Sequence, residues 1–369
     1  MNSRERMITV LEHKLPDRVP LAEYWIDAKV VNAILPESDA PKGHIGTVNA
    51  LPKDSMLSRS NQMVEYLDMD VVTVPTMIYE HDEVEWVDEE KRIFRDKWGA
   101  LQMLTQDAIP IPTKPAHIET EEDLARYKPP DPGKSPVIGK VRELKKRYPN
   151  GEKAIAVVGE SGWAPGVYLR GGLENFLLDF ALRPDFIKDI MQLGTDYYCD
   201  LYKMVIPAGA DIVLLGDDYS DKNGPMISPA QFEEIVLPCD AKVVSAVKKA
   251  GGYCIKHTDG DIRKIMDSLV GTGLDCLGPL EPVPGMELDS VLKRYPGKIS
   301  VMGNISVDLL SRGSVEDIVK ATKHLLTTVS SIGPHIMSSG NTIASSVKPE
   351  NFLAMVNTVR EFGKYPTSM

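Results

Sequence analysis

The sequence has few cysteines and no long apolar stretch, and these absences exclude several classes of protein. Only four cysteines occur in 369 residues, and none has Cys-x-x-Cys spacing, which predicts free thiols in a reducing cytoplasm. The sequence contains no apolar run of about 18 residues, the length that marks a membrane-spanning helix. The first residues are too charged for a secretory signal. We therefore expect a soluble cytoplasmic protein.

Basic residues are outnumbered by acidic ones, 42 against 53, which gives a net charge of −11. This balance argues against a protein that binds nucleic acid or an anionic membrane surface. The sequence also lacks a nucleophile elbow, a phosphate-binding P-loop and a His-Glu-x-x-His motif. Apolar residues make up 43% of the chain, enough to fill a core.

The chain instead shows a regular alternation of short apolar runs and helical patterns. Eight strands are predicted, at residues 19–25, 69–75, 154–159, 210–215, 253–256, 274–277, 298–302 and 335–338. Helices are predicted at 4–14, 56–66, 167–206, 229–250, 261–271, 286–295, 314–331 and 349–363. This alternation is typical of an α/β parallel (β/α)8 TIM barrel. A doubly wound sheet is the alternative, and the lack of Gly-x-Gly-x-x-Gly after the first strand makes it less favoured.

Two segments interrupt the alternation. Residues 36–55 are rich in proline, glycine, serine and lysine and predict a long excursion. Residues 83–98 alternate apolar and polar side chains around an acidic turn, which predicts a β-hairpin after the second strand, in an insertion of about 77–135. A capping box at Thr120 predicts a short helix there. We expect one domain that spans residues 1–369.

Polar side chains follow the predicted strands, at the rim where parallel α/β sheets bind ligands. His257 and Asp259 come directly after strand 253–256, and both could face one metal ion or take part in acid–base chemistry. The alternatives are a hydrogen-bonded histidine at a strand end and an aspartate that caps a helix or forms a turn. Glu160 and Glu281 are the candidates for a further carboxylate that would complete a metal site with His257 and Asp259.

Asp217 and Asp218 follow the apolar strand 210–215. Two adjacent carboxylates should repel each other, so one of them is expected to have a raised pKa. The alternative is a role in helix capping and loop solvation. The catalytic candidates are His257, Asp217, Asp218 and Glu160, and the substrate-binding candidates are Tyr24, Trp25, Tyr219, Asn304 and Asn341.

Several short motifs, in this order and spacing, resemble the uroporphyrinogen decarboxylase-like superfamily. They are Arg4-Glu5-Arg6, Asp17-Arg18-Val19-Pro20, Gly216-Asp217-Asp218, Ile227-Ser228-Pro229, Lys256-His257-Thr258-Asp259-Gly260, Gly303-Asn304-Ile305 and Ser338-Ser339-Gly340-Asn341 with Pro349-Glu350-Asn351. The resemblance covers nearly the whole chain and implies a (β/α)8 barrel. It also implies one of two activities: decarboxylation of uroporphyrinogen, or methyl transfer to or from corrinoid proteins, usually with zinc.

The details of the resemblance favour methyl transfer from oxygen. The decarboxylases of the superfamily carry arginines after the first strand, whereas residues 22–27 here contain two acids and no arginine. The thiol-activating methyltransferases carry His-x-Cys and a later cysteine, and the matching positions here are His257, Asp259 and Asn341. An oxygen-rich site suits an oxygen substrate, so the pattern is similar to methyltransferases that demethylate methoxylated aromatics.

We therefore expect a methyltransferase that moves a methyl group from a small methoxylated aromatic to the Co(I) corrinoid of a partner protein. Zinc would be held by His257, Asp259 and Glu281; without metal, a protonated Asp218 or His257 would donate a proton. The aromatic ring would contact Tyr24 and Trp25. The excursion at 36–55 and the hairpin are expected docking edges, and a homodimer is left open. The alternatives are a decarboxylase of a smaller acid and a non-catalytic corrinoid- or ligand-binding barrel.

Overall fold

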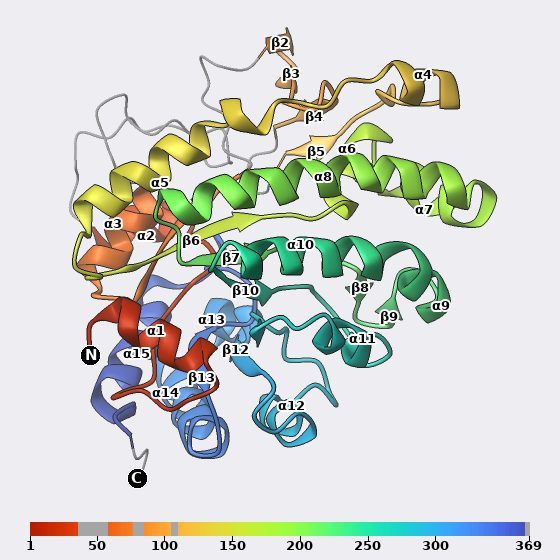
Figure 1. Ribbon diagram of the computed structural model, residues 1–369. Helices are drawn as coiled ribbons and strands as arrows, with labels where there is room; N and C mark the ends of the chain where they lie inside the picture. The colour runs from red at the N-terminus through yellow and green to blue at the C-terminus, as the bar shows by residue number, and fades with distance from the viewer. Residues whose placement is uncertain (36–57, 77–84, 105–109, 366–369) are drawn as a thin grey trace.

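A curled sheet of seven parallel strands forms the centre of the molecule (Figure 1). The computed structural model describes residues 1–35, 58–76, 85–104 and 110–365 of the chain. In spatial order the strands are β1 (Val71–Pro75), β6 (Ala154–Gly159), β7 (Ile212–Leu215), β10 (Tyr253–Lys256), β11 (Cys276–Leu277), β12 (Ser300–Ile305) and β13 (His335–Ser339). Nearly every residue in these strands is buried, because helices cover the outer face and side chains fill the interior.

Leu21 closes this sheet into a barrel. It pairs in parallel with Met337 of β13. On its other side, the Leu21 carbonyl accepts a hydrogen bond of 2.8 Å from the amide of Asp70, the residue before β1. The segment around Leu21 therefore occupies the eighth position, and the predicted (β/α)8 TIM barrel is confirmed.

The predicted strand at residues 19–25 is wrong in its extent, since only Leu21 and, further on, Ile26 form isolated bridges. Pro20 has no N–H to donate. At the other end, the Ser339 amide donates to the carboxylate of Glu23 over 2.8 Å rather than to a backbone carbonyl. A hydrogen bond to a side chain thus replaces a backbone hydrogen bond between the two segments at this position.

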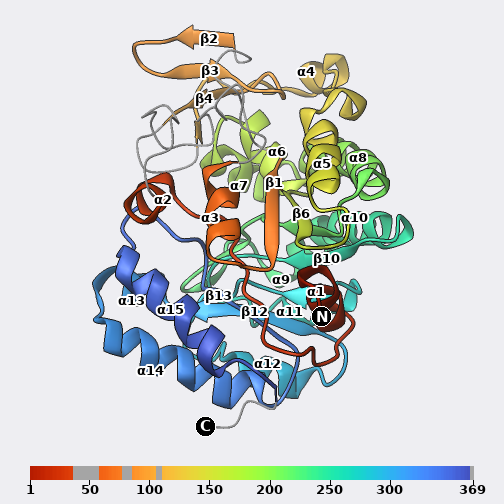
Figure 2. The same ribbon diagram turned by 90° about the vertical axis from the view of Figure 1, so that its left-hand side faces the viewer.

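Fifteen α-helices occur in the described residues, and most of them pack around the outside of the barrel. They are α1 (Ser3–Leu11), α2 (Ala28–Ile34), α3 (Arg59–Tyr66), α4 (Glu121–Arg126), α5 (Pro136–Arg147), α6 (Trp163–Leu169), α7 (Leu173–Leu182), α8 (Pro184–Ala208), α9 (Pro229–Gln231), α10 (Leu237–Lys249), α11 (Met266–Gly271), α12 (Leu288–Arg294), α13 (Val307–Arg312), α14 (Val315–Leu325) and α15 (Pro349–Phe362). Helices α8 and α10 run side by side on one flank (Figure 1), and α14 and α15 pack together on another (Figure 2). None of the helices in these described segments is long and apolar enough to cross a membrane.

Helix α1 covers the end of the barrel where the strands begin. Met7, Val10 and Leu11 of this helix join one apolar cluster with alternate residues of the strands, such as Ala156 and Ile255. Arg6 of the same helix donates to Asp70 over 2.6 Å. The amino-terminal end of the barrel is thereby filled, so the opposite rim is the one available for ligands.

The insertion forms a separate antiparallel sheet above the barrel (Figures 1 and 2). Its strands are β2 (Glu85–Asp88), β3 (Ile93–Arg95), β4 (Leu101–Met103) and β5 (Ile111–Pro112). The predicted hairpin is confirmed by the β2–β3 pair, while β4 and β5 are additional. Trp98, 1% exposed, packs edge-on against Tyr197 of α8 with ring centroids 4.9 Å apart, which ties the insertion to the barrel. The expected excursion at 36–55 lies outside the described residues.

Candidate functional site

A cavity of about 780 Å³ opens at the carboxyl-terminal rim of the barrel. Many of the predicted rim residues line this one cavity: Tyr24, Trp25, Glu160, Asp217, Asp218, His257, Asp259 and Asn341. They come together because parallel strands end at the same rim. Apolar side chains, among them Ile111 of the insertion and Leu173 of α7, form another part of the wall.

His257 is held rigidly in this cavity. Its amide donates to the Leu215 carbonyl over 2.8 Å and so prolongs the pairing of β10 with β7. Its Nδ1 lies 2.6 Å from the carbonyl oxygen of Pro279. A carbonyl only accepts hydrogen bonds, so Nδ1 carries a proton, and Nε2 is the ring nitrogen that faces the cavity.

Two carboxylates flank Nε2. His257 Nε2 lies 3.5 Å from Asp259 Oδ1 and 3.7 Å from Asp218 Oδ1. Asp218 Oδ1 also accepts the Asp259 amide over 3.0 Å, which fixes the two loops relative to each other. Burial raises the pKa of Asp259 to about 6, against the lowering effect of His257. A cation bound beside Asp259 would therefore stabilise the ionised form of its carboxyl group.

These three groups fit a metal ion. Their ligand atoms all lie within 4.8 Å of one another, and they offer one imidazole nitrogen and two carboxylate oxygens. Catalytic zinc is commonly held by three protein ligands with a fourth position open. A histidine whose second nitrogen donates to a backbone carbonyl is the usual ligand arrangement. The site therefore suits a divalent cation in a mainly oxygen environment.

Glu281, the predicted third ligand, lies beside this group and not in it. Its exposed carboxylate accepts the Gly260 amide over 3.0 Å. Gly260 has φ 75°, and a Cβ there would lie 2.3 Å from the Asp221 carbonyl oxygen, so the turn requires glycine. The carboxylate that completes the group is Asp218.

Asp217 and Asp218 have different partners in the structure. Asp217 accepts the amides of Ser161 and Ala164 over 2.6 and 2.8 Å, at the start of α6. It is 1% exposed, and its carbonyl accepts Lys256 Nζ over 2.7 Å. Asp217 therefore positions the loop after β6, as the capping alternative proposed, while Asp218 faces the histidine.

Glu160 is the acid at the bottom of the cavity. It accepts hydrogen bonds of 2.5 Å from the hydroxyls of Tyr168 and Tyr198. Burial raises the pKa of Glu160 to about 7, and the charge of Asp217 adds to this effect. A carboxyl group that titrates near neutrality can hold a proton for catalysis.

The insertion reaches this acid through Lys97. Its Nζ donates to the Thr76 carbonyl over 3.1 Å and to the Tyr198 hydroxyl over 3.4 Å. Burial lowers the pKa of Lys97 to about 8. Sequence reasoning missed Tyr198 and Lys97 as partners of Glu160 because they are distant in sequence, and it gave no sign that Tyr168, eight residues on, donates its hydroxyl to this acid.

The substrate-binding candidates divide into two groups. The Tyr24 ring lies 5.4 Å from the His257 ring between centroids, and Trp25 and Asn341 also line the cavity. Tyr219 is fully buried and donates to both Asp240 oxygens over 2.8 and 2.9 Å. Asn304 is buried in β12 and is not among the lining residues. Neither residue is among those that line the cavity, and their contact with substrate stays a prediction.

Comparison with known proteins gives a consistent picture. A family profile described as uroporphyrinogen decarboxylase (URO-D) matches residues 100–362. The uroporphyrinogen decarboxylase of Ruthia magnifica subsp. Calyptogena magnifica is 25% identical over 258 residues, 67% of this chain and 72% of that protein. The one from Ralstonia pickettii (strain 12J) is 23% identical over 98% of this chain and 96% of that protein.

Among solved structures, a methyltransferase from Methanosarcina mazei superposes with a TM-score of 0.72. The match covers 98% of this chain and 99% of the other, at 17% sequence identity. At that identity the likeness establishes the fold alone.

Proposed function

The chain belongs to the uroporphyrinogen decarboxylase (URO-D) family, and we propose that it is a methyltransferase on this enzyme fold. The donor is a methoxylated aromatic, and the acceptor is the Co(I) corrinoid of a partner protein. The observation that carries this proposal is the group formed by Asp218, His257 and Asp259 at the cavity, beside Tyr24. A methyl aryl ether needs its oxygen activated before the carbon–oxygen bond breaks. This group would activate it by holding a metal ion.

Zinc would be held by His257 Nε2 and the carboxylates of Asp218 and Asp259. When bound, it supplies Lewis-acid chemistry at the ether oxygen of the donor. Carboxylate ligands favour an oxygen substrate over a thiol, and the described ligand group contains no cysteine. Pro279 holds the imidazole in the ligating tautomer through its carbonyl.

The other side chains of the cavity orient the donor and supply the proton that the leaving phenolate accepts. The aromatic rings of Tyr24, Trp25, Trp163 and Tyr168 line it and suit an aryl group. Glu160 titrates near neutrality in the same cavity, so it can deliver a proton to the leaving phenolate. The methyl–oxygen bond would break as the methyl group bonds to the acceptor docked at the open side of the cavity, and the phenolate would keep the electron pair and accept the proton of Glu160.

Decarboxylation of a smaller acid is the second candidate, and the curated decarboxylases among the relatives favour it. Uroporphyrinogen itself is a poor fit. The loop between Leu21 and α2 contains no arginine, whereas a polyanionic porphyrinogen needs complementary positive charge.

The test combines metal content with methyl transfer. Mass spectrometry of the purified protein should find about one zinc per chain, the number that one three-ligand site holds, and His257→Ala should lose it. Free cob(I)alamin and a methoxylated aromatic provide the assay, since methylation changes the corrinoid absorption spectrum. The His257→Ala protein should remain folded by circular dichroism and be inactive.

A matched control is His324→Ala on α14, which should keep both zinc and activity. Full activity of His257→Ala would refute the proposal. Absence of zinc from both proteins, with release of carbon dioxide from a candidate acid, would establish the decarboxylase instead.

A further inference from the structure

A chain of hydrogen bonds leads from the insertion to the acid at the bottom of the cavity. Lys97, which lies between β3 and β4, donates from Nζ to the Tyr198 hydroxyl over 3.4 Å. Tyr198 of α8 donates in turn to Glu160 Oε2 over 2.5 Å. Both donors in this chain therefore point toward Glu160, which is the direction that a proton must take to reach the carboxylate.

The two ends of this chain differ in their access to solvent. Lys97 is half-buried, whereas Tyr198 is 0% exposed and Glu160 is 4% exposed. Each Glu160 oxygen also accepts a tyrosine hydroxyl, Oε1 from Tyr168 and Oε2 from Tyr198. Little of Glu160 is therefore open to water, and Lys97 is the member of the chain that solvent reaches most readily.

The proton affinities at the two ends suit transfer to Glu160. Burial lowers the pKa of Lys97 to about 8, although the charges of Glu160 and Asp96 act in the opposite direction. Burial raises the pKa of Glu160 to about 7; the charge of Asp217 adds to this effect, and Lys97 and the tyrosine hydroxyls oppose it. The two ends thus hold a proton with similar strength, so it can pass between them near neutral pH.

Tyr198 is suited to pass a proton on without losing its own. Burial, with the nearby charge of Glu160, raises the pKa of Tyr198 well above its ordinary value, so a free phenolate is disfavoured. Its hydroxyl accepts from Lys97 and donates to Glu160, and it also lies 3.3 Å from Thr76 Oγ1. A hydroxyl that accepts one proton as it releases another stays neutral.

We propose that Lys97 and Tyr198 form a relay that returns a proton to Glu160 after each turnover. Lys97 Nζ gives a proton to the Tyr198 oxygen as the Tyr198 hydroxyl proton moves to Glu160 Oε2. The neutral amine then takes a proton from hydronium or a buffer acid, so the carboxylate gains one proton and the solvent loses one. Lys97 acts through Glu160 and is not among the residues that line the cavity. The use of this proton in methyl transfer rests on the proposed function, whereas the relay rests on the hydrogen-bond chain.

The rate at which Glu160 gains a proton tests the relay without any methyl transfer. Light releases a caged proton and takes the full chain from about pH 8 to about pH 6, across the pKa of Glu160 of about 7. Time-resolved infrared spectroscopy follows the carboxylic acid band that is absent from Glu160→Gln. Lys97→Met should slow its appearance at least about tenfold, and so should Tyr198→Phe. An unchanged rate in either variant would overturn the relay.

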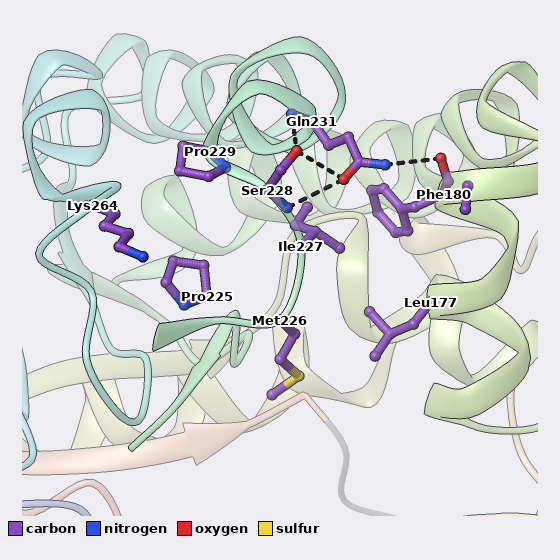
Figure 3. Close-up of a pocket in the computed structure, with 10 residues that line it drawn as sticks. Leu177, Phe180, Pro225, Met226, Ile227, Ser228, Pro229, Gln231 and Lys264 are labelled. Carbon is purple, nitrogen blue, oxygen red and sulfur yellow. Dashed lines mark hydrogen bonds between the residues drawn. The ribbon is translucent and has the colours of Figure 1, made fainter. Parts of the chain in front are cut away.

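Lys264→Met is the matched control for loss of a lysine near the rim. Lys264 is exposed and lines a neighbouring pocket of about 470 Å³, which shares Met226 with the cavity. Figure 3 shows Lys264 beside Pro225 in that pocket. The rate of Glu160 protonation in this variant should match that of the wild type. A rate slowed as much as in Lys97→Met would overturn the relay, because loss of any nearby positive charge would then explain both results.

Added amines separate proton transfer from an effect of charge alone. Lys97→Ala leaves room for a small amine beside Tyr198, so ethylammonium should restore the rate of Glu160 protonation as its concentration rises. Tetramethylammonium carries the same charge but has no N–H proton to give, and it should have no effect. Equal recovery with the two ions would overturn the relay.

Turnover distinguishes the relay from the proposed function. With cob(I)alamin in excess, Lys97→Met should methylate about one corrinoid per chain at the wild-type rate and then slow at least about tenfold, because only the first proton is already on Glu160. If the wild type methylates no cob(I)alamin but Lys97→Met protonates Glu160 slowly, the methyltransferase fails and the relay stands. If the wild type transfers methyl groups and Lys97→Met protonates Glu160 at the wild-type rate, the relay fails and the methyltransferase stands.

Discussion

Asn341 donates a hydrogen bond from its side-chain amide to Asp259 Oδ1 over 2.7 Å. This contact joins the loop after β13 to the loop after β10, across the rim of the barrel. Asn341→Ala removes the donor and lets the carboxylate rotate. Because the groups that orient metal ligands typically contribute 10–100-fold to metal affinity, we expect zinc affinity to fall by about that factor. Competition with a chromophoric chelator measures it.

Asn223→Ala is the matched control for this substitution. Asn223 lies in the exposed turn between β8 (Ser220–Asp221) and β9 (Gly224–Pro225) and also contacts an aspartate, Asp221. Its replacement should leave zinc affinity unchanged. If Asn341→Ala binds zinc as tightly as the wild type, the orientation that Asn341 gives to Asp259 does not contribute to zinc affinity.

Gly216 provides the space for the Tyr24 hydroxyl. A Cβ at this position would lie 2.0 Å from that oxygen, so Gly216→Ala must displace Tyr24 from its place beside His257. Overpacking of this kind costs about 1–3 kcal/mol of unfolding free energy. We expect that loss in urea denaturation, together with weaker binding of the donor.

Gly139→Ala in α5 is the control for steric effects. No atom lies within 4 Å of a Cβ built at Gly139, and alanine is favoured over glycine within a helix by about 1 kcal/mol. This variant should be equal to or more stable than the wild type. A Gly216→Ala protein as stable as Gly139→Ala would show that Tyr24 moves aside without cost.

The contrast between predicted and missed strands has a physical origin. Strands β6 and β10 were predicted with their observed bounds, because central parallel strands are continuous apolar runs between turn signals. The closing segment around Leu21 was overextended, since its apolar run does not reveal that Glu23 binds Ser339 from far along the chain. Helices α2 and α5 were missed although each begins after a residue that favours a helix start, Asp27 and Ser135.

Predicted rim residues from several loops line the cavity, but members of the three-residue ligand group were predicted as metal ligands only where they are neighbours in one loop. His257 and Asp259 share the loop after β10, whereas the third group depends on strand register. Lys256 pairs with Leu215 on one side and Leu277 on the other, so Asp218 and Glu281 both come near Asp259. The hydrogen bond from the Gly260 amide draws Glu281 away, and the sequence gives no sign of it.

Tyr198→Phe should raise the pKa of Glu160 above its present value of about 7, because Tyr198 donates to the carboxylate and so stabilises its charged form. If protonated Glu160 supplies the proton, the rate falls as pH rises through this pKa. The substitution should therefore move that fall to higher pH in a profile of kcat/KM. Tyr197→Phe, which keeps its ring against Trp98, should leave the profile in place. An unchanged profile in Tyr198→Phe would remove Glu160 from the proton transfer.

Glu23 should make the protein less stable as pH rises. Burial raises its pKa from an ordinary 4.5 to about 8, although Ser339 donates to it from both its hydroxyl and its amide. The folded state therefore binds this proton more tightly than the unfolded chain does. Its contribution to stability is complete below about pH 4.5 and is lost as pH rises through about 8.

Glu23→Gln removes this titration and preserves the contacts. The glutamine oxygen can accept the Ser339 amide, while its NH₂ group donates to the Ser339 hydroxyl. At pH 8 we expect the unfolding free energy of Glu23→Gln to exceed that of the wild type by at least about 1 kcal/mol. A difference of this size corresponds to a pKa change of less than one unit between the unfolded and folded states. The two proteins should converge toward pH 5 in urea denaturation. Glu316→Gln, at an exposed residue of α14, controls for loss of a surface charge. Parallel stability curves for Glu23→Gln and the wild type would mean that Glu23 is ionised in the folded protein, with its charge compensated at the barrel rim.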